Sequence, residues 1–110
     1  MALPRKNRIT SKKEIDYVFK NGRKIRGYFL FLRFVGNQIG YPRFVFIIPS
    51  KFISLAVDRN RIRRLFSEEI KKMSYISKNG CDYIVLVSKK TERTEFGHLA
   101  EELHKLLSKK

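Results

Sequence analysis

Five consecutive apolar or aromatic residues, Tyr83 to Val87, form the segment that most constrains the fold. They lie within a predicted strand from Asp82 to Ser88. A strand whose side chains are apolar on both faces has to be covered on both, so this segment predicts a buried central strand of a sheet. The rest of the chain must then supply the neighbouring strands and the helices that cover them.

Three segments have the apolar spacing of such helices. The first begins at Ser11. Ser11 and Glu14 have the spacing of a capping box, in which each side chain accepts a hydrogen bond from a free backbone amide at the helix start. Gly22 is expected to end this helix. The second extends from Ala56 to Met73, and the third begins near Thr94. The apolar stripes comprise Ile15, Val18 and Phe19 in the first helix, Ile62, Leu65, Phe66, Ile70 and Met73 in the second, and Phe96, Leu99, Ala100, Leu103, Leu106 and Leu107 in the third.

Two further segments, Tyr28 to Val35 and Phe44 to Ile48, are rich in residues that favour strands, and a short strand is predicted around Arg23 to Arg26. Strands that alternate with helices predict an α/β or α+β domain in which helices cover a small sheet.

The longest predicted strand, Tyr28 to Val35, has two different faces, because successive side chains of a strand point to opposite sides. One face would carry Phe29, Phe31, Arg33 and Val35, and the other Tyr28, Leu30, Leu32 and Phe34.

The charge of the chain points to its partner. The 110 residues fit one domain, 1–110, of which we expect residues 1–8 and 108–110 to be flexible. Lysine and arginine number 25 against 10 acidic residues, a net charge of +15, which indicates a polyanionic partner: nucleic acid first, an anionic membrane second. No apolar run approaches the roughly 18 residues that span a bilayer, and the basic N-terminus lacks the apolar stretch of a signal peptide. We therefore expect a cytoplasmic protein that binds nucleic acid and no membrane.

The strongest functional motif is a cluster of arginines in the second predicted helix. Arginine suits phosphate because its planar fork makes paired hydrogen bonds and can stack on a base. A merely solvated helix face usually pairs lysine with glutamate four residues away, whereas here Asp58 is the only acid before Glu68. We therefore favour phosphate binding over a solvated face. The cluster consists of Arg59, Asn60, Arg61, Arg63 and Arg64.

This motif and its approach, Ser50-Lys51 followed by Ala56-Val57-Asp58-Arg59-Asn60-Arg61-Ile62-Arg63-Arg64-Leu65, resemble the signature of bacterial ribonuclease P proteins. The resemblance extends over nearly the whole chain. It implies an α+β fold: a single compact α-β-β-β-α-β-α domain with helices packed on a small central sheet. It also implies a left-handed βαβ crossover, as in the second domain of a ribosomal protein.

The resemblance also implies a function. The protein would be a subunit of a ribonucleoprotein endonuclease that removes 5′ leaders from precursor transfer RNA, and the catalytic RNA would do the chemistry. The protein is expected to be monomeric in a 1:1 complex with that RNA, and magnesium would be held mainly by the RNA. The residues expected to bind the RNA subunit are Lys51, Arg59, Asn60, Arg61, Arg63 and Arg64. A cleft formed by Ile15, Phe19, Phe31 and Arg33 would take the leader, although the family usually has aromatic residues where Ile15 and Arg33 stand.

The sequence offers no protein-borne catalytic centre or metal site. The pairs Glu68-Glu69 and Glu101-Glu102 point to different sides of their helices and are interpreted as solvated faces, whereas metal-assisted cleavage needs converging carboxylates. Cys81 is the only cysteine. Two other classes would share the charge: a ribosomal protein without a role in transfer RNA processing, and a DNA-binding protein. The second would need a paired positioning helix that this chain does not supply.

Overall fold

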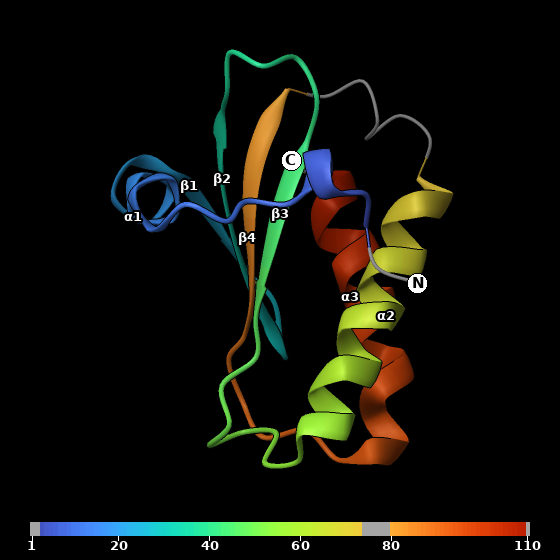
Figure 1. The fold of residues 1–110 in the computed structure, drawn as a ribbon. Coiled ribbons are helices and arrows are strands. Elements are labelled where there is room, and N and C mark those ends of the chain that lie inside the picture. The colour runs from blue at the N-terminus through green and yellow to red at the C-terminus, as the bar shows by residue number, and fades with distance from the viewer. Residues whose placement is uncertain (1–2, 74–79, 110) are drawn as a thin grey trace.

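The computed structural model describes residues 3–73 and 80–109. It contains three α-helices, four strands and two short 3-10 turns (Figure 1). All three predicted helices and all four predicted strands are confirmed, with small differences at their ends. In chain order the elements are η1 (Arg5–Asn7), α1 (Lys12–Asn21), β1 (Arg23–Arg26), β2 (Leu30–Gly36), β3 (Arg43–Ile47), α2 (Ala56–Lys72), β4 (Cys81–Val87), η3 (Arg93–Glu95) and α3 (Phe96–Lys109).

The four strands form one mixed sheet in the order β1-β2-β4-β3. Strand β2 is antiparallel to both β1 and β4, and β3 is parallel to β4. As the apolar run predicted, β4 is an inner strand, and Asp82 to Val85 and Val87 are buried. Its position between β2 and β3 explains why its sequence does not alternate.

Helices cover both faces of this sheet (Figure 1). Helices α2 and α3 lie side by side on one face and bury the main core there. Helix α1 crosses the opposite face, where Val18 and Ile84 are buried away from the main cluster. The side of α1 that faces away from the sheet stays open to solvent, with Tyr17 56% exposed.

The connection from β3 through α2 to β4 is left-handed. In Figure 1 the sheet is seen from its β3 edge. The chain descends β3, rises through α2 on the right and descends β4 behind β3, a counter-clockwise turn that recedes from the viewer. About 98% of such connections turn the other way, so this crossover distinguishes the fold and confirms the implied topology.

The start of the longest strand differs from the prediction. Strand β2 begins at Leu30 rather than Tyr28, because the Glu102 carboxylate of α3 accepts hydrogen bonds from the amides of Tyr28, Phe29 and Leu30. Phe29 therefore lies before the strand and is buried in the main core, at 8% exposed. Its predicted place on the face of Phe31 and Arg33 is wrong.

The cap of α1 also differs. Ser11 Oγ accepts the amide of Glu14, as predicted, but the Glu14 carboxylate reaches Arg43 of β3 instead of returning to the helix start. At the other end, a Cβ on Gly22 would lie 2.5 Å from the Val18 carbonyl oxygen, so glycine allows the helix to end against the backbone of β2.

The N-terminal residues that the structure describes contact the rest of the domain. Leu3 is buried, η1 follows it, and the Ile9 amide donates to the Phe44 carbonyl at the edge of β3. Residues 108 and 109 belong to α3. Residues 1, 2 and 110, also expected to be flexible, lie outside the described residues. No described helix is long and apolar enough to cross a membrane.

Candidate nucleic-acid interface

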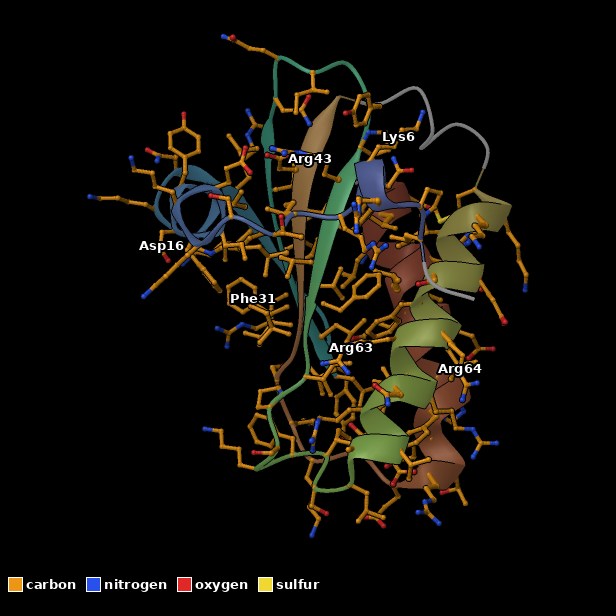
Figure 2. All side chains as sticks on the ribbon, viewed as in Figure 1. Lys6, Asp16, Phe31, Arg43, Arg63 and Arg64 are labelled. Atoms are coloured by element: carbon orange, nitrogen blue, oxygen red, sulfur yellow. The ribbon has the colours of Figure 1, made fainter. Side chains whose placement is uncertain are left out.

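Helix α2 turns its arginines outward because its apolar stripe is anchored in the core. Ile62 and Phe66 are fully buried, which leaves Arg61, Arg63 and Arg64 exposed. Figure 2 shows Arg63 and Arg64 leaving the helix in different directions. We call Arg61, Arg63 and Arg64 the α2 cationic surface.

Arg59 has a different environment from the other arginines. Its Nη1 donates to the carbonyl oxygens of Ile53, at 2.8 Å, and Ser54, at 3.0 Å. It therefore closes the loop that leads into α2. The arginines were expected to lack acidic partners within the helix, and the partners seen are neutral: loop carbonyls for Arg59, and Asn60 Oδ1 for Arg63, whose Nη1 donates to it at 3.1 Å.

Asp58, which lies one turn before Arg61 on α2, does not neutralise this surface. Asp58 pairs with Arg93 of η3, whose Nε lies 3.1 Å from Oδ2. The positive charge of Arg61 and Arg64 therefore stays available to a partner. Lys51 is exposed in the loop before α2, with its Nζ 5.0 Å from the Phe52 ring centroid.

The second predicted site lies on the other face of the sheet, beside α1. The Arg33 guanidinium is 5.9 Å from the ring centroid of Phe19 and 5.8 Å from that of Phe31. The structure thus brings these three predicted residues together. Ile15 is half-buried on α1, one turn before Phe19.

Strand pairing shows a member of this site that the sequence analysis missed. Arg26 of β1 is the Cα partner of Phe31, and its guanidinium lies 5.3 Å from the Phe31 ring. Only the register between β1 and β2 brings the two together, and the sequence does not contain that register. We call Phe19, Arg26, Phe31 and Arg33 the α1 cleft, after the leader-binding cleft to which the resemblance assigns three of them.

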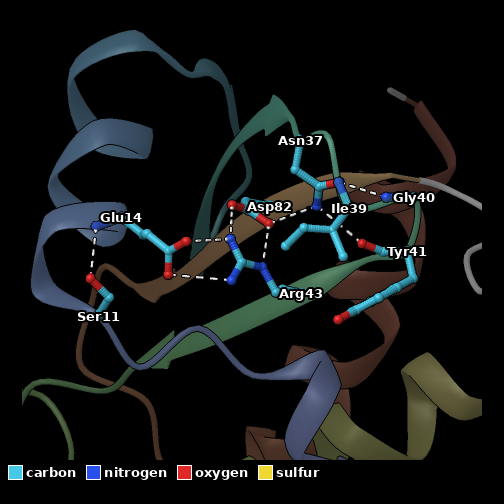
Figure 3. Close-up of polar contacts among 8 residues, drawn as sticks. All are labelled: Ser11, Glu14, Asn37, Ile39, Gly40, Tyr41, Arg43 and Asp82. Atoms are coloured by element: carbon cyan, nitrogen blue, oxygen red, sulfur yellow. Dashed lines mark hydrogen bonds and ion pairs between the residues drawn. The ribbon is translucent and has the colours of Figure 1, made fainter.

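A partly buried ionic network holds α1 on the sheet (Figure 3). Arg43 Nη2 lies 2.7 Å from Asp82 Oδ2 and 2.9 Å from Glu14 Oε2, and Asn37 donates to Asp82 Oδ1. The hydrogen bond to Asp82, with that to Glu14 after it, raises the pKa of Arg43 above its ordinary value although burial opposes this. The sequence pattern alone indicates no role for Arg43.

Two of the four glutamates that the sequence pattern indicated as solvated have partners in the structure. Glu69 lies 2.9 Å from His104 Nδ1, and Glu102 binds the three amides before β2. Among residues 3–73 and 80–109, no group of three His, Cys, Asp or Glu side chains could hold a metal ion. The chemistry that these surfaces offer is binding: cations on α2, and cations with aromatic rings in the cleft.

Comparison with known proteins identifies relatives over nearly the full chain. A family model described as Ribonuclease P matches residues 3–110. The Ribonuclease P protein component of a Thermoanaerobacter strain is 29% identical over 102 residues, which cover 93% of this chain and 87% of the relative. That of Syntrophomonas wolfei is 38% identical over 87 residues, which cover 79% of this chain and 71% of the relative.

Solved structures agree with these matches. The RNase P protein of Thermotoga maritima superimposes with a TM-score of 0.80 at 25% identity, covering 94% of this chain and 96% of the other. The Staphylococcus aureus RNase P protein has a TM-score of 0.77 at 20% identity, which supports the fold alone.

Proposed function

The chain belongs to the ribonuclease P protein family, and we propose that its two cationic surfaces divide the binding work of that enzyme. The family is the protein component of an RNA-based endoribonuclease that matures the 5′ ends of transfer RNAs, and its partner is the ribonuclease P RNA. The relatives do not favour the alternative of a ribosomal protein. Which surface meets which RNA is the proposal.

The α2 cationic surface binds the RNA subunit. The observation that carries this assignment is a helix whose apolar side is anchored by fully buried Ile62 and Phe66 and whose outer side presents Arg61, Arg63 and Arg64, while Asp58 is paired with Arg93. Arginine forks match phosphate oxygens in pairs. Asn60, which already orients Arg63, and Lys51, which is exposed in the loop before α2, are proposed to bind the same RNA.

The α1 cleft binds the single-stranded leader of precursor transfer RNA. Aromatic rings provide stacking platforms for unpaired bases, and the guanidiniums beside them provide phosphate contacts. Phe31 is half-buried and Phe19 is 38% exposed, so both rings keep surface that a base can cover. Ile15 extends the apolar wall along α1.

The protein contributes binding, and the RNA subunit does the cleavage. The magnesium ions of the reaction would be held mainly by that RNA, and among the described residues of the protein no group of three His, Cys, Asp or Glu side chains could hold one. One protein bound to one RNA would orient the leader and reduce phosphate repulsion at low magnesium.

Reconstitution with the catalytic RNA and a labelled precursor transfer RNA at low magnesium tests the proposal. We expect the protein alone to cleave nothing and the mixture to remove the leader faster than the RNA alone. The variant Arg61→Ala with Arg64→Ala should bind the RNA subunit more weakly. Its log–log salt slope should be shallower by about 1.4–1.8, twice the roughly 0.7–0.9 expected for each phosphate contact.

The matched control is Lys105→Ala with Lys109→Ala, which removes the same charge from α3. It should keep both the affinity and the slope of the parent. Equal losses in both variants would mean that only net charge matters. Cleavage of the precursor by RNA-free protein would refute the division of labour.

A further inference from the structure

The outer edge of β3 is only partly covered by the N-terminal segment. Strand β3 lies at the edge of the sheet, where the Ile9 amide donates to the outward carbonyl of Phe44. Since the backbone groups of a strand alternate in direction, the N–H and C=O of Phe46 also point outward. The bridge between Arg8 and Phe44 is isolated, and among residues 3–73 and 80–109 no backbone group beyond the sheet bonds Phe46.

A pocket opens beside this edge, between the N-terminal segment, β3 and α2. Its volume is about 280 Å³. A cavity of about 150 Å³ is enough to bind benzene, so this pocket has room for the flat ring system of a nucleobase. We call it the β3-edge pocket, and its walls include Arg8, Thr10, Phe44, Phe46, Arg63 and Ser67.

The β3-edge pocket combines aromatic walls with a cationic rim. Phe44 is buried and Phe46 is half-buried, with ring centroids 6.3 Å apart. Arg8 and Arg63 are exposed, and within the described part of the chain neither forms an ion pair. In Figure 2, Arg63 lies on the side of α2 that is turned to β3, whereas Arg64 lies on the opposite side. Arg63 therefore connects the α2 cationic surface to this pocket.

The polar groups of the pocket can meet the edge of a base. Phe46 offers one backbone donor and one backbone acceptor, and every base has a donor beside an acceptor on its Watson–Crick edge. The Ser67 hydroxyl, which is buried, donates to the Arg63 carbonyl oxygen at 2.9 Å, so its own oxygen can still accept a hydrogen bond. Asn60 holds Nη1 of Arg63, whose other N–H groups can bind phosphate.

We propose that the β3-edge pocket takes one unpaired nucleobase of the RNA subunit, whose flanking phosphates bind Arg8 and Arg63. This inference rests on the proposed function, because the pocket adjoins the α2 cationic surface. Unpaired RNA nucleotides can turn their bases outward onto aromatic walls and polar groups. A peptide strand suits the site less well. The N-terminal segment already pairs with Phe44 and β3 ends at Ile47, so too little of the edge remains for a further strand.

Single abasic nucleotides at each unpaired position of the catalytic RNA test this pocket, through binding to the parent protein and to Thr10→Trp. Thr10 is exposed at the rim, so the larger ring fills the pocket from outside the core. One abasic position should weaken binding of the parent by about 5- to 150-fold, as the loss of one base from an aromatic contact does. Thr10→Trp should bind the intact RNA with a similar loss, and the same abasic position should weaken it no further.

His98→Trp is the matched control, because it adds the same ring at an exposed position of α3. It should keep the parent affinity and the full effect of the abasic position, and thermal melts check that both variants fold. A benzophenone amino acid in place of Thr10 gives a second measurement that does not need the tryptophan variant. It should crosslink to the nucleotide that the abasic scan identifies.

Two results would overturn the base pocket: a Thr10→Trp protein that folds and responds to every abasic position as the parent does, or crosslinks that form only with precursor transfer RNA. Either result leaves the α2 cationic surface intact. Unchanged binding of the RNA subunit by Arg61→Ala with Arg64→Ala would instead overturn the proposed function.

Discussion

Arg43 shows how one side chain can position a site that it does not enter. It joins Glu14 of α1 to Asp82 of β4, and only 13% of its side chain and 8% of that of Asp82 are exposed. Removing one partner of a buried ion pair leaves the other charge buried without compensation. The same contacts tie α1, the helix that carries Phe19, to the sheet (Figure 3).

We expect Arg43→Ala to lower the free energy of unfolding by about 3–5 kcal/mol, because Asp82 loses its buried partner. Arg43→Lys keeps the charge without the planar fork that reaches both acids, so its loss should be smaller. Urea denaturation measures both. Arg23→Ala, an exposed arginine, should change stability by no more than about 0.5 kcal/mol. An Arg43→Ala protein as stable as the parent would refute the structural role of this network.

Secondary structure followed from local patterns, whereas the pairing between elements did not. The apolar stripes of α1, α2 and α3 and the unbroken run of β4 predicted these elements, because burial leaves its period in the sequence. The role of Arg26 could not be predicted from the sequence, because it depends on the pairing of β1 with β2 that places Arg26 beside Phe31. The contacts of Glu102 could not be predicted either. In the sequence, a glutamate that accepts hydrogen bonds from backbone amides does not differ from any other glutamate on an exposed helix face.

Glu102 therefore offers a test at the level of elements. We expect Glu102→Ala to lower the free energy of unfolding by about 1.5–3 kcal/mol, the usual contribution of a hydrogen bond to a charged group, since water can replace part of the contact at exposed Tyr28. Gly27→Ala should act in the same direction, because its Cβ would meet the Glu102 carboxylate. The neighbour Glu101, which is exposed, is the control, and Glu101→Ala should leave the melting temperature unchanged.

At the scale of the whole molecule, the sheet separates two binding surfaces. Phe31 lies on the side of α1, and Arg64 points away from the sheet on the side of α2 (Figure 2). The core between them is formed by fully buried residues such as Leu32, Val85 and Phe66. A rigid layer of this kind can hold the leader at a fixed position relative to the RNA subunit without any change of shape.

This separation predicts that the two surfaces act independently. Phe31→Ala should lower the affinity of the reconstituted enzyme for precursor transfer RNA by about 1–3 kcal/mol for each base that loses its stacking, and leave the affinity for mature transfer RNA unchanged. Arg61→Ala with Arg64→Ala should weaken RNA-subunit binding but, at saturating protein, keep the ratio of precursor to mature affinity. Because residues without shared partners contribute additively within about 0.3–0.5 kcal/mol, the combined variant should show both defects at their separate sizes, as titrations of the four proteins would measure. A larger coupling energy, or a Phe31→Ala protein that binds the RNA subunit weakly, would mean that leader and RNA subunit share one surface rather than two.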